Sequence, residues 1–513
     1  MPHRPRPWKP CGRALALGLP WSLAVAVIGC ESRPAGSQEG VLPADAPAPN
    51  VIFLLIDALR ADRLGVYGHK GGLSPTMDAI AAEGVIFDRA VAQAPWTQPA
   101  VASLFCSYYP GVHKAISYEK ALEGRSSDGA QARVFAEAFT TLAEALQAAG
   151  YATAAFVANG FVVPELGFDQ GFDHFDATLL RKPGNLVNEA TIAWLARRDP
   201  SKPVFVYLHF MDVHGPYDAG PKFLDPLLDL VENMPDKREL TPKELTALNY
   251  LRRLPRVCND PARHKRLMRY REYWVARYEA GVREADFHLA TLRERLTEMG
   301  VWNDAYVILT ADHGEALCEH GIWGHGLSVH HDQMHVPLIL RWPGVLPAGK
   351  RIRPMVRLID LMPTLLQQLR LPGVEGIQGS SVLPYLAGRS PTESLPALGE
   401  AVKLGPEQKA LYRGDWKLVY LEARPPRALL YNIAKDPSER ADCSRQNPAE
   451  LRALFEALTQ QLAENERLAA GVEVTDTPMS EEWRRQLEAL GYVGGESDAD
   501  ESPGDDAESP PPP

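Results

Sequence analysis

The sequence predicts an α/β fold in which a doubly wound, mixed but mostly parallel sheet is flanked by helices. Short apolar runs rich in β-branched and aromatic residues occur at 51–56, 152–158, 204–210 and 305–311. Such runs are typical of parallel strands that are buried on both faces. Amphipathic stretches separate these runs, at 74–84, 135–150 and 278–300. Strands that alternate with helices over most of the chain indicate this architecture.

The N-terminal segment has the features of a bacterial export signal. A stretch with four basic residues, 1–13, precedes an apolar segment at 14–29 that is too short and too interrupted by proline for an ordinary membrane span. It ends in Val27-Ile28-Gly29-Cys30, which resembles a lipobox. We therefore predict a signal peptide at 1–29 and a lipid on Cys30 that anchors the protein to a membrane. The alternative is an ordinary signal peptide in which Cys30 is incidental.

This signal places the protein in the bacterial cell envelope, on the extracytoplasmic side of a membrane. Residues 30–49 are rich in Pro, Ala, Gly and Ser and predict a flexible tether, so that the folded body begins at Asn50. Residues 496–513 contain seven acidic residues and no basic or large apolar one, which predicts a disordered tail. The net charge of −11 argues against nucleic acid as a partner. The oligomeric state stays open.

Four cysteines remain in the body of the chain, at Cys106, Cys258, Cys318 and Cys443. They lie far apart and show no CxxC or other metal-binding spacing. They are therefore either buried thiols or members of up to two disulfides in an oxidising compartment.

Polar side chains follow three of the predicted strands directly. Asp57 follows the first strand, Asp212 and His214 follow the third, and Asp312 and His313 follow the fourth. In open α/β sheets, functional groups gather at the carboxyl ends of the strands. A single Asp at such a place is usually a helix N-cap, but three strand ends together predict a common site. Carboxylates with an imidazole suit one divalent ion, which could be Ca, Mn, Zn or Mg.

Seven motifs in order resemble the sulfatase family of the alkaline phosphatase superfamily. They are NVIFLLIDALRADRLGVYG, APWTQPAVASLFCSYYPGVHKA, GYATAAFVANGFVVPELGFDQGFDHFD, FVYLHFMDVHGPYD, VILTADHGEALCEHGIWGHG, VPLILRWPG and RLIDLMPTLLQQLRLP. Residues 415–440 are similar to the C-terminal antiparallel-sheet subdomain of those enzymes. The resemblance implies an alkaline-phosphatase-like catalytic domain at 50–385, with a charged helical insertion at 218–275. A smaller subdomain with an antiparallel sheet and helices would follow at 386–495.

The resemblance also implies roles for individual residues. Asp57, Asp312 and His313 would bind one divalent cation together with the nucleophile at position 97. His214 and His325 would contact the anionic group of the ester substrate or protonate its leaving oxygen; the plainer alternatives are a turn residue and a solvated loop histidine. His209 is predicted to be structural. Four further histidines stay unassigned: His320, His330, His331 and His335.

The chain departs from the sulfatase pattern at the nucleophile. Sulfatases carry Cys or Ser in a C-x-P-x-R signature, which is oxidised to formylglycine, whereas residues 97–101 here are Thr-Gln-Pro-Ala-Val. We therefore expect no formylglycine. The second Asp of the family's Asp-Asp pair is Ala58, and Asn159 stands in the region where many arylsulfatases have Lys-x-His.

These departures favour Thr97 as a nucleophile that needs no oxidation. A threonine ester must be broken by attack at the central atom, a route that suits phosphoryl groups well. The alternative is that Thr97 merely caps a helix. Asn159 is predicted to hydrogen-bond the transferred group, and Arg60 either to bind the substrate or to form a salt bridge.

The leading hypothesis is a metal-dependent hydrolase of sulfate or phosphate esters. Two alternatives stand beside it. One is a phosphodiesterase or a phosphoethanolamine-type transferase. The other is a non-catalytic protein that binds a sulfated or phosphorylated glycan or lipid.

Overall fold

The computed structural model describes residues 40–117, 131–230, 261–389, 395–403 and 405–489. Several predictions fall on other residues and stay predictions: the signal peptide, the lipid on Cys30, most of the tether, residues 231–260 of the insertion and the acidic tail. Cys258 also lies outside the described residues.

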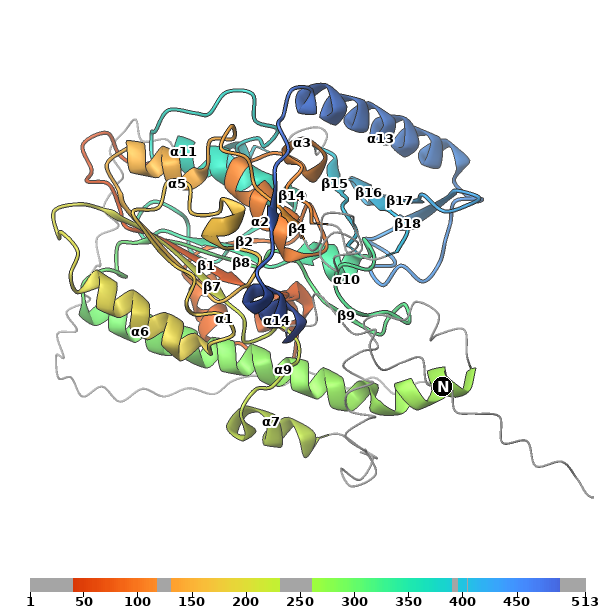
Figure 1. Cartoon of the computed structure of the whole chain (residues 1–513), viewed down its shortest axis with the longest axis horizontal. Coiled ribbons are helices and arrows are strands. Elements are labelled where there is room, and N and C mark those ends of the chain that lie inside the picture. Colours follow the sequence, from red (N-terminus) through yellow and green to blue (C-terminus); the bar gives the residue numbers. More distant parts are fainter. Residues whose placement is uncertain (1–39, 118–130, 231–260, 390–394, 404, 490–513) are drawn as a thin grey trace, which may run out of the picture. The chain divides into compact units, whose positions relative to one another are not determined.

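An eight-stranded sheet forms the centre of the structure (Figure 1), in the order β13-β2-β12-β8-β1-β7-β5-β6. The four predicted strands lie side by side within it, and β1 pairs in parallel with β7 and β8, as β5 does with β7. Strand β12 is antiparallel to both of its neighbours, so the sheet is mixed but mostly parallel, as predicted. The strands are β1 (Val51–Ile56), β2 (Val85–Phe87), β5 (Ala152–Val157), β6 (His174–Asp176), β7 (Val204–Phe210), β8 (Tyr306–Thr310), β12 (Leu338–Arg341) and β13 (Lys350–Ile352).

Helices cover both faces of this sheet because its central strands are apolar on both sides. Every residue of β1, β7 and β8 is buried. Figure 1 shows α2 (Thr97–Cys106), α5 (Leu142–Ala148) and α11 (Leu361–Gln368) on one face. The other face carries α1 (Pro75–Ala82), α6 (Gly184–Leu195) and α9 (Pro261–Glu298). This arrangement confirms the predicted fold class.

Two predicted helix boundaries are wrong. Helix α9 begins at Pro261 rather than near 278, so it extends into the predicted insertion at 218–275, whose described part also contains helix α7 (Pro221–Leu228). Helix α5 starts at Leu142 rather than near 135, because Thr141 and Glu144 form a capping box that fixes its first turn.

Shorter elements join these layers. The short α-helices are α3 (Pro110–His113), α10 (His331–Met334) and α12 (Leu383–Leu386), and the 3₁₀ turns are Ala61–Arg63, Gly65–Tyr67, Pro164–Leu166 and Leu358–Asp360. The short strands are β3 (Ala90–Val91), β9 (Ala316–Leu317), β10 (Trp323–Gly324), β11 (His335–Val336) and β14 (Val356–Arg357). The strands β9 and β10 form a hairpin directly after the fourth predicted strand end.

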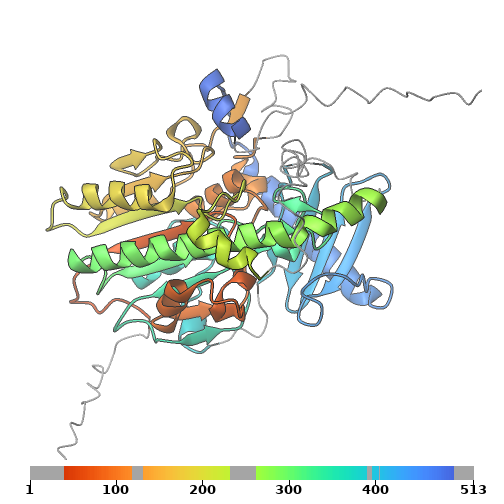
Figure 2. The ribbon, with the colours of Figure 1, turned by 90° about the horizontal axis from the view of Figure 1, so that it is seen from below.

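A second, antiparallel sheet forms the C-terminal subdomain, as predicted. Its strands are β15 (Ala397–Gly399), β16 (Gln408–Arg413), β17 (Trp416–Leu421) and β18 (Arg427–Asn432), and helix α13 (Pro448–Ala469) packs on it. Figure 2 shows this sheet beside the main α/β part. The chain then returns to the main part: β19 (Asp476–Pro478) pairs with β4 (Gln131–Arg133), and α14 (Glu481–Ala489) follows.

The predicted tether is wrong for its last residues. Val41 is buried in the main hydrophobic core, and Leu42 packs against that core. The Leu42 backbone N–H donates to the carbonyl of Gln368 at 2.8 Å. Two adjacent apolar side chains in an otherwise small and polar segment are enough to dock it, so the ordered body begins before Asn50.

The described residues also bear on the state of the cysteines and on whether a helix could span a membrane. Cys106 and Cys443 are free thiols, which favours the thiol alternative for these two. Among the described helices, none combines the length and the apolar character that crossing a membrane requires.

Gly281 lets helix α9 approach the loop that follows β7 and carries His214. A Cβ at this position would lie 2.4 Å from the carbonyl oxygen of Asp212 and 3.1 Å from the Cα of Val213. Both neighbours are backbone atoms, which cannot rotate away. The glycine therefore sets the spacing between a helix and a loop of the candidate site.

We predict that Gly281→Ala destabilises the protein although it raises helix propensity. In an open helix this change would stabilise by about 0.8–1.0 kcal/mol, whereas overpacking here costs about 1–3 kcal/mol. Denaturant unfolding measures the difference, with the exposed Thr291→Ala on the same helix as the control. A Gly281→Ala protein more stable than the wild type would show that the contact is not tight.

Candidate active site

The sheet order brings the polar residues of two predicted strand ends together. Strand β1 lies between β8 and β7, so Asp57 after β1 and the pair Asp312-His313 after β8 occupy neighbouring positions at the carboxyl edge of the sheet. All three side chains are fully buried. The structure thus assembles the ligand set that the sequence predicts.

Asp57, Asp312 and His313 present three ligand atoms to one point. The Nε2 atom of His313 lies 3.5 Å from Oδ1 of Asp57 and 3.5 Å from Oδ2 of Asp312. Ion–ligand distances of about 2.0–2.5 Å place neighbouring ligands roughly 3–3.5 Å apart. The spacing therefore fits a single divalent cation.

The hydrogen bonds around these residues leave the same three atoms for an ion. Nδ1 of His313 donates to the Gly314 carbonyl at 2.8 Å, which leaves the Nε2 lone pair facing the carboxylates. Oδ1 of Asp312 accepts the backbone N–H groups of Ala58 and His313. In contrast, Oδ1 of Asp57 and Oδ2 of Asp312 are buried and accept no hydrogen bond within the described structure. Buried oxygens of this kind are costly unless a cation binds them.

Electrostatics point to the same conclusion. Burial raises the pKa of Asp312 to about 6, with the Asp57 charge as the next cause. Burial also opposes ionisation of Asp57, but His214, His209 and His313 lower its pKa below the ordinary value. Two carboxyl groups so close together repel each other when both are ionised. A divalent cation between them would remove that repulsion.

Thr97 lies at this centre and is the first residue of helix α2. Its hydroxyl donates to Oδ2 of Asp57 at 3.3 Å, and its Oγ1 lies 3.4 Å from Nε2 of His313. The N-cap of the helix is Trp96, and the Thr97 side chain caps nothing. The alternative that Thr97 is a helix cap is therefore wrong.

Asn159 joins Thr97 to Asp57. Its Nδ2 donates to Oδ2 of Asp57 at 2.7 Å and to Oγ1 of Thr97 at 3.3 Å. The N–H of Phe161 donates to the Asn159 Oδ1 at 2.7 Å, which fixes which end of the amide faces the site. Asn159 thus stands beside the hydroxyl, where a transferred group would bind.

His209 belongs to the site, although the sequence predicted only a structural role. Its Nε2 donates to Oδ2 of Asp57 at 3.1 Å, and its Nδ1 accepts from the Tyr207 hydroxyl at 3.0 Å. It therefore orients a candidate metal ligand. His209 lies within a continuous apolar strand, so the sequence alone could not distinguish it from any other buried histidine.

His214 and His325 form the next layer. The His325 ring centroid lies 4.5 Å from that of His313 and 4.8 Å from that of His214. Nδ1 of His325 lies 3.2 Å from both oxygens of the fully buried Glu315 carboxylate. Glu315 is a second residue that sequence reasoning missed, because its partner sits ten positions away across the β9–β10 hairpin.

Arg60 forms salt bridges, which was one of the two predicted roles for this residue. Its guanidinium binds Asp62 at 2.7 Å and Glu319 at 2.7 Å, and it donates to the Glu315 carbonyl at 2.9 Å. Its side chain is only 7% exposed. The structure therefore does not support substrate binding by Arg60, because acidic partners already hold its charge.

Asp212 does not join the centre either. Its Oδ1 lies 2.9 Å from Nδ1 of His288 and accepts from the Gly184 N–H. It lines a cavity of about 340 Å³ together with Arg181, Lys182 and His214. This cavity therefore adjoins the candidate site through His214.

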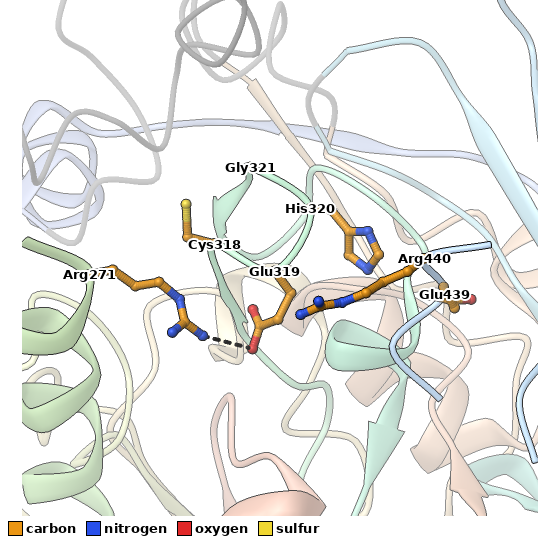
Figure 3. Close-up of a pocket in the computed structure, with 7 residues that line it drawn as sticks. All are labelled: Arg271, Cys318, Glu319, His320, Gly321, Glu439 and Arg440. Atoms are coloured by element: carbon orange, nitrogen blue, oxygen red, sulfur yellow. Dashed lines mark ion pairs between the residues drawn. The ribbon is translucent and has the colours of Figure 1, made fainter. Parts of the chain in front are cut away.

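A second cluster of possible metal ligands lies beyond the β9–β10 hairpin, formed by His320, His330 and Glu439. It borders a pocket of about 520 Å³, and Figure 3 shows Arg271 and Arg440 approaching from opposite sides with Glu319 between them. Both oxygens of Glu439 already have partners: Lys417 Nζ lies 2.5 Å from Oε1, and Nδ1 of His330 donates to Oε2 at 2.9 Å. A buried ammonium beside the carboxylate makes this cluster the weaker cation site.

The comparisons with known proteins agree with this geometry. Residues 49–371 match the model of the family described as Sulfatase, and residues 318–467 match the one described as N-sulphoglucosamine sulphohydrolase, C-terminal. The chain belongs to the sulfatase family. Arylsulfatase K of Xenopus laevis is 23% identical to it, with 86% of this chain and 88% of the relative covered. N-acetylglucosamine-6-O-sulfatase of Bacteroides thetaiotaomicron is 22% identical, with 82% and 87% covered.

Solved structures share the fold of this sulfatase-family chain. One is a protein in complex with its substrate, D-glucosamine-2-N,6-O-disulfate; it superposes with a TM-score of 0.67 at 20% identity, covering 82% of this chain and 99% of the other. Another is the phosphonate monoester hydrolase of Agrobacterium radiobacter, with a TM-score of 0.60 at 20% identity, covering 85% and 98%.

We predict that this sulfatase-family chain binds one divalent ion through Asp57, Asp312 and His313. Bound ion should raise the free energy of unfolding, by about 2.7 kcal/mol at a concentration 100 times the Kd. Asp312→Asn should abolish that gain, because it removes an ionic ligand. Metal analysis of the purified protein and thermal unfolding with and without a chelator measure both effects.

His320→Ala is the matched control, because it removes a ligand from the second cluster only. It should leave the bound ion and the chelator effect unchanged. If His320→Ala loses the ion and Asp312→Asn retains it, the cation binds at the second cluster and the prediction is wrong.

Proposed function

We propose that the protein is a metal-dependent hydrolase of sulfate or phosphate esters that uses Thr97 as its nucleophile. The observation that carries this proposal is the position of the Thr97 hydroxyl, which contacts Asp57, His313 and Asn159 at 3.3–3.4 Å. A divalent cation held by Asp57, Asp312 and His313 would lower the pKa of an adjacent hydroxyl and neutralise an anionic ester.

The residues divide the reaction between them. The Thr97 oxygen attacks the central sulfur or phosphorus atom, and its proton passes toward Oδ2 of Asp57, which already accepts it in a hydrogen bond. A bond forms between Oγ1 and the central atom while the bond to the leaving oxygen breaks. Asn159 Nδ2, 3.3 Å from Oγ1, donates to the group in transfer. Water then attacks the central atom and passes a proton to His325, while the bond to Oγ1 breaks and Thr97 regains its proton from Asp57.

His325 is placed to protonate the leaving oxygen. The Glu315 carboxylate, 3.2 Å from Nδ1, orients the ring. His214 stands between His325 and the cavity of about 340 Å³ that it lines with Arg181 and Lys182. That cavity is large enough for part of a leaving group and carries both cationic and acidic side chains.

Phosphoric esters are the second candidate substrate class. A threonine cannot form the aldehyde hydrate that expels sulfate by elimination, so its ester must be cleaved at the central atom, which suits phosphorus. The similarity to a phosphonate monoester hydrolase is compatible with that route. The sequence matches to sulfatases favour sulfate esters, such as those of sulfated sugars. Phosphodiester hydrolysis or transfer to an acceptor would use the same residues.

The lipobox-like segment ending at Cys30 supports a place for this activity on the outside of a bacterial membrane, with a lipid as the anchor. The substrate would then be an anionic ester that reaches the cell envelope.

We predict that Thr97→Val lowers kcat about 10³-fold or more, because it removes the nucleophilic oxygen but keeps the shape. Thr97→Ser should retain activity within about 10-fold. The assay supplies aryl sulfate, phosphate monoester, phosphodiester and phosphonate monoester with Ca, Mn, Zn or Mg. Mass spectrometry of the peptide that contains Thr97 should detect a transferred group.

Two outcomes would contradict the proposal. Turnover by Thr97→Val at the wild-type rate would exclude Thr97 as the nucleophile. If the wild type binds sulfated or phosphorylated ligands but cleaves none of the four esters with any ion, the protein is a binder. Thermal unfolding of Thr97→Val controls for folding.

We further predict that His325→Asn slows esters with poor leaving groups by about 10²–10⁴-fold. Esters of 4-nitrophenol need little protonation of the leaving oxygen and should lose far less. Glu315→Gln should show the same selectivity to a smaller degree, since it leaves His325 in place. Equal losses for good and poor leaving groups would show that His325 is not the acid.

A further inference from the structure

The proposed reaction requires positive charge near Thr97 beyond the metal. A divalent cation offsets only the carboxylates of Asp57 and Asp312, so an anionic ester would add uncompensated negative charge to a buried site. Arg60 cannot supply the balance, because Asp62 and Glu319 hold its guanidinium. A cation from another part of the chain would supply the balance.

Backbone contacts bring the segment 401–403 of the C-terminal subdomain to the wall of the site. The Gly326 N–H donates to the Pro95 carbonyl at 2.8 Å, and the Lys403 N–H donates to the Gly326 carbonyl at 2.8 Å. The indole N–H of Trp96 donates to the Ala401 carbonyl at 2.7 Å. Pro95 and Trp96 directly precede Thr97, and Gly326 directly follows His325, so the segment is joined to both catalytic candidates.

The side chain of Lys403 runs along this wall. Lys403 is 7% exposed, and its stem packs on Gly326, where an added Cβ would lie 3.1 Å from the Lys403 Cβ. Its Nζ lies 5.1 Å from the centroid of the Trp96 ring and 4.8 Å from that of Phe161. The two rings meet edge to face, with centroids 5.6 Å apart.

The two rings also locate this ammonium relative to the reacting groups. Trp96 is the N-cap of the helix that begins with Thr97. The Phe161 N–H holds the amide of Asn159, which contacts the Thr97 hydroxyl. The ammonium therefore lies against two side chains whose own backbones position the nucleophile and its amide neighbour. Ring faces favour a positive charge at this place.

We infer that Lys403 is a substrate-binding residue, whose ammonium binds an oxygen of the sulfate or phosphate group that Thr97 attacks. This inference rests on the proposed function, because it assigns a residue to the same site. A charge-assisted hydrogen bond from an ammonium suits the oxygens of either group.

Lys403→Met tests the inference, because it keeps the apolar stem over Trp96 and Phe161 but removes the charge. It should weaken the binding of inorganic sulfate or phosphate about 10- to 100-fold, and lower kcat/KM by a similar factor. Lys403→Arg keeps the charge and should stay within about 10-fold of the wild type. Calorimetry with the metal-loaded protein measures anion binding without any turnover.

Lys435→Met is the matched control, because this exposed lysine of the same subdomain loses the same charge. It should leave anion binding and kcat/KM unchanged. Metal content should be the same in all variants, since Lys403 is not a metal ligand. If Lys403→Met matches the wild type in anion binding, the inference is overturned while the proposed function stands.

The experiment gives a different result if the proposed function, rather than the role of Lys403, is wrong. In that case the wild type turns over none of the esters, but calorimetry with sulfate and phosphate still reports on Lys403. Should Lys403→Met fail to fold, a crystal structure of the wild type with inorganic sulfate decides. An anion oxygen within about 3.2 Å of the Lys403 Nζ supports the inference, and a site anion beyond the reach of this ammonium overturns it.

Discussion

The repulsion between two buried carboxylates, and the cation that would relieve it, is the constraint on which the site depends. Asp57 and Asp312 follow neighbouring parallel strands, so the sheet itself forces them together. Each gives one oxygen to hydrogen bonds and leaves the other without a donor in the described structure. Such an arrangement is costly in a low-dielectric interior unless an ion offsets it. The fold therefore favours the binding of a cation between these two carboxylates. The side on which their oxygens lack donors is the side on which the reaction would take place.

One carboxylate oxygen links the surrounding elements to this centre. Oδ2 of Asp57 accepts from His209 of β7, from Asn159 after β5 and from Thr97 of α2. Two of these donors are fixed in turn, His209 by Tyr207 and Asn159 by Phe161. Because the donors come from separate elements, a small shift in any of them changes the position of the hydroxyl. A rigid sheet buried on both faces suits this requirement, since well-supported groups need little reorganisation during a reaction.

The central strands and the ligand set could be predicted from the sequence, because both leave local signals. Fully buried strands are apolar throughout, and their carboxyl ends meet at one edge, so position makes Asp57, Asp312 and His313 candidates. Position also nominates Asp212 and His214, and it is the family resemblance that separates the ligand set from these two. His209 and Glu315 could not be found, because a histidine inside a strand and a glutamate before a hairpin look ordinary until their partners are known. Arg60 illustrates the same limit, since its partner Glu319 lies 259 residues away in sequence. Contacts at such separations depend on the packing of the whole domain, which a local pattern does not encode.

The choice of threonine at position 97 follows from the same geometry. Its hydroxyl lies in the first turn of α2, where free backbone N–H groups give the helix end a partial positive charge. Together with a cation on one side and Lys403 on the wall, this field favours an oxygen that becomes negative and an ester that is already negative. The β-branched side chain adds stiffness, because the methyl group of threonine limits its rotamers more than serine would. A fully buried threonine therefore holds its oxygen toward Asp57. A positioned threonine hydroxyl can replace the aldehyde hydrate of formylglycine only if the ester it forms can be cleaved by direct attack of water on the sulfur or phosphorus atom.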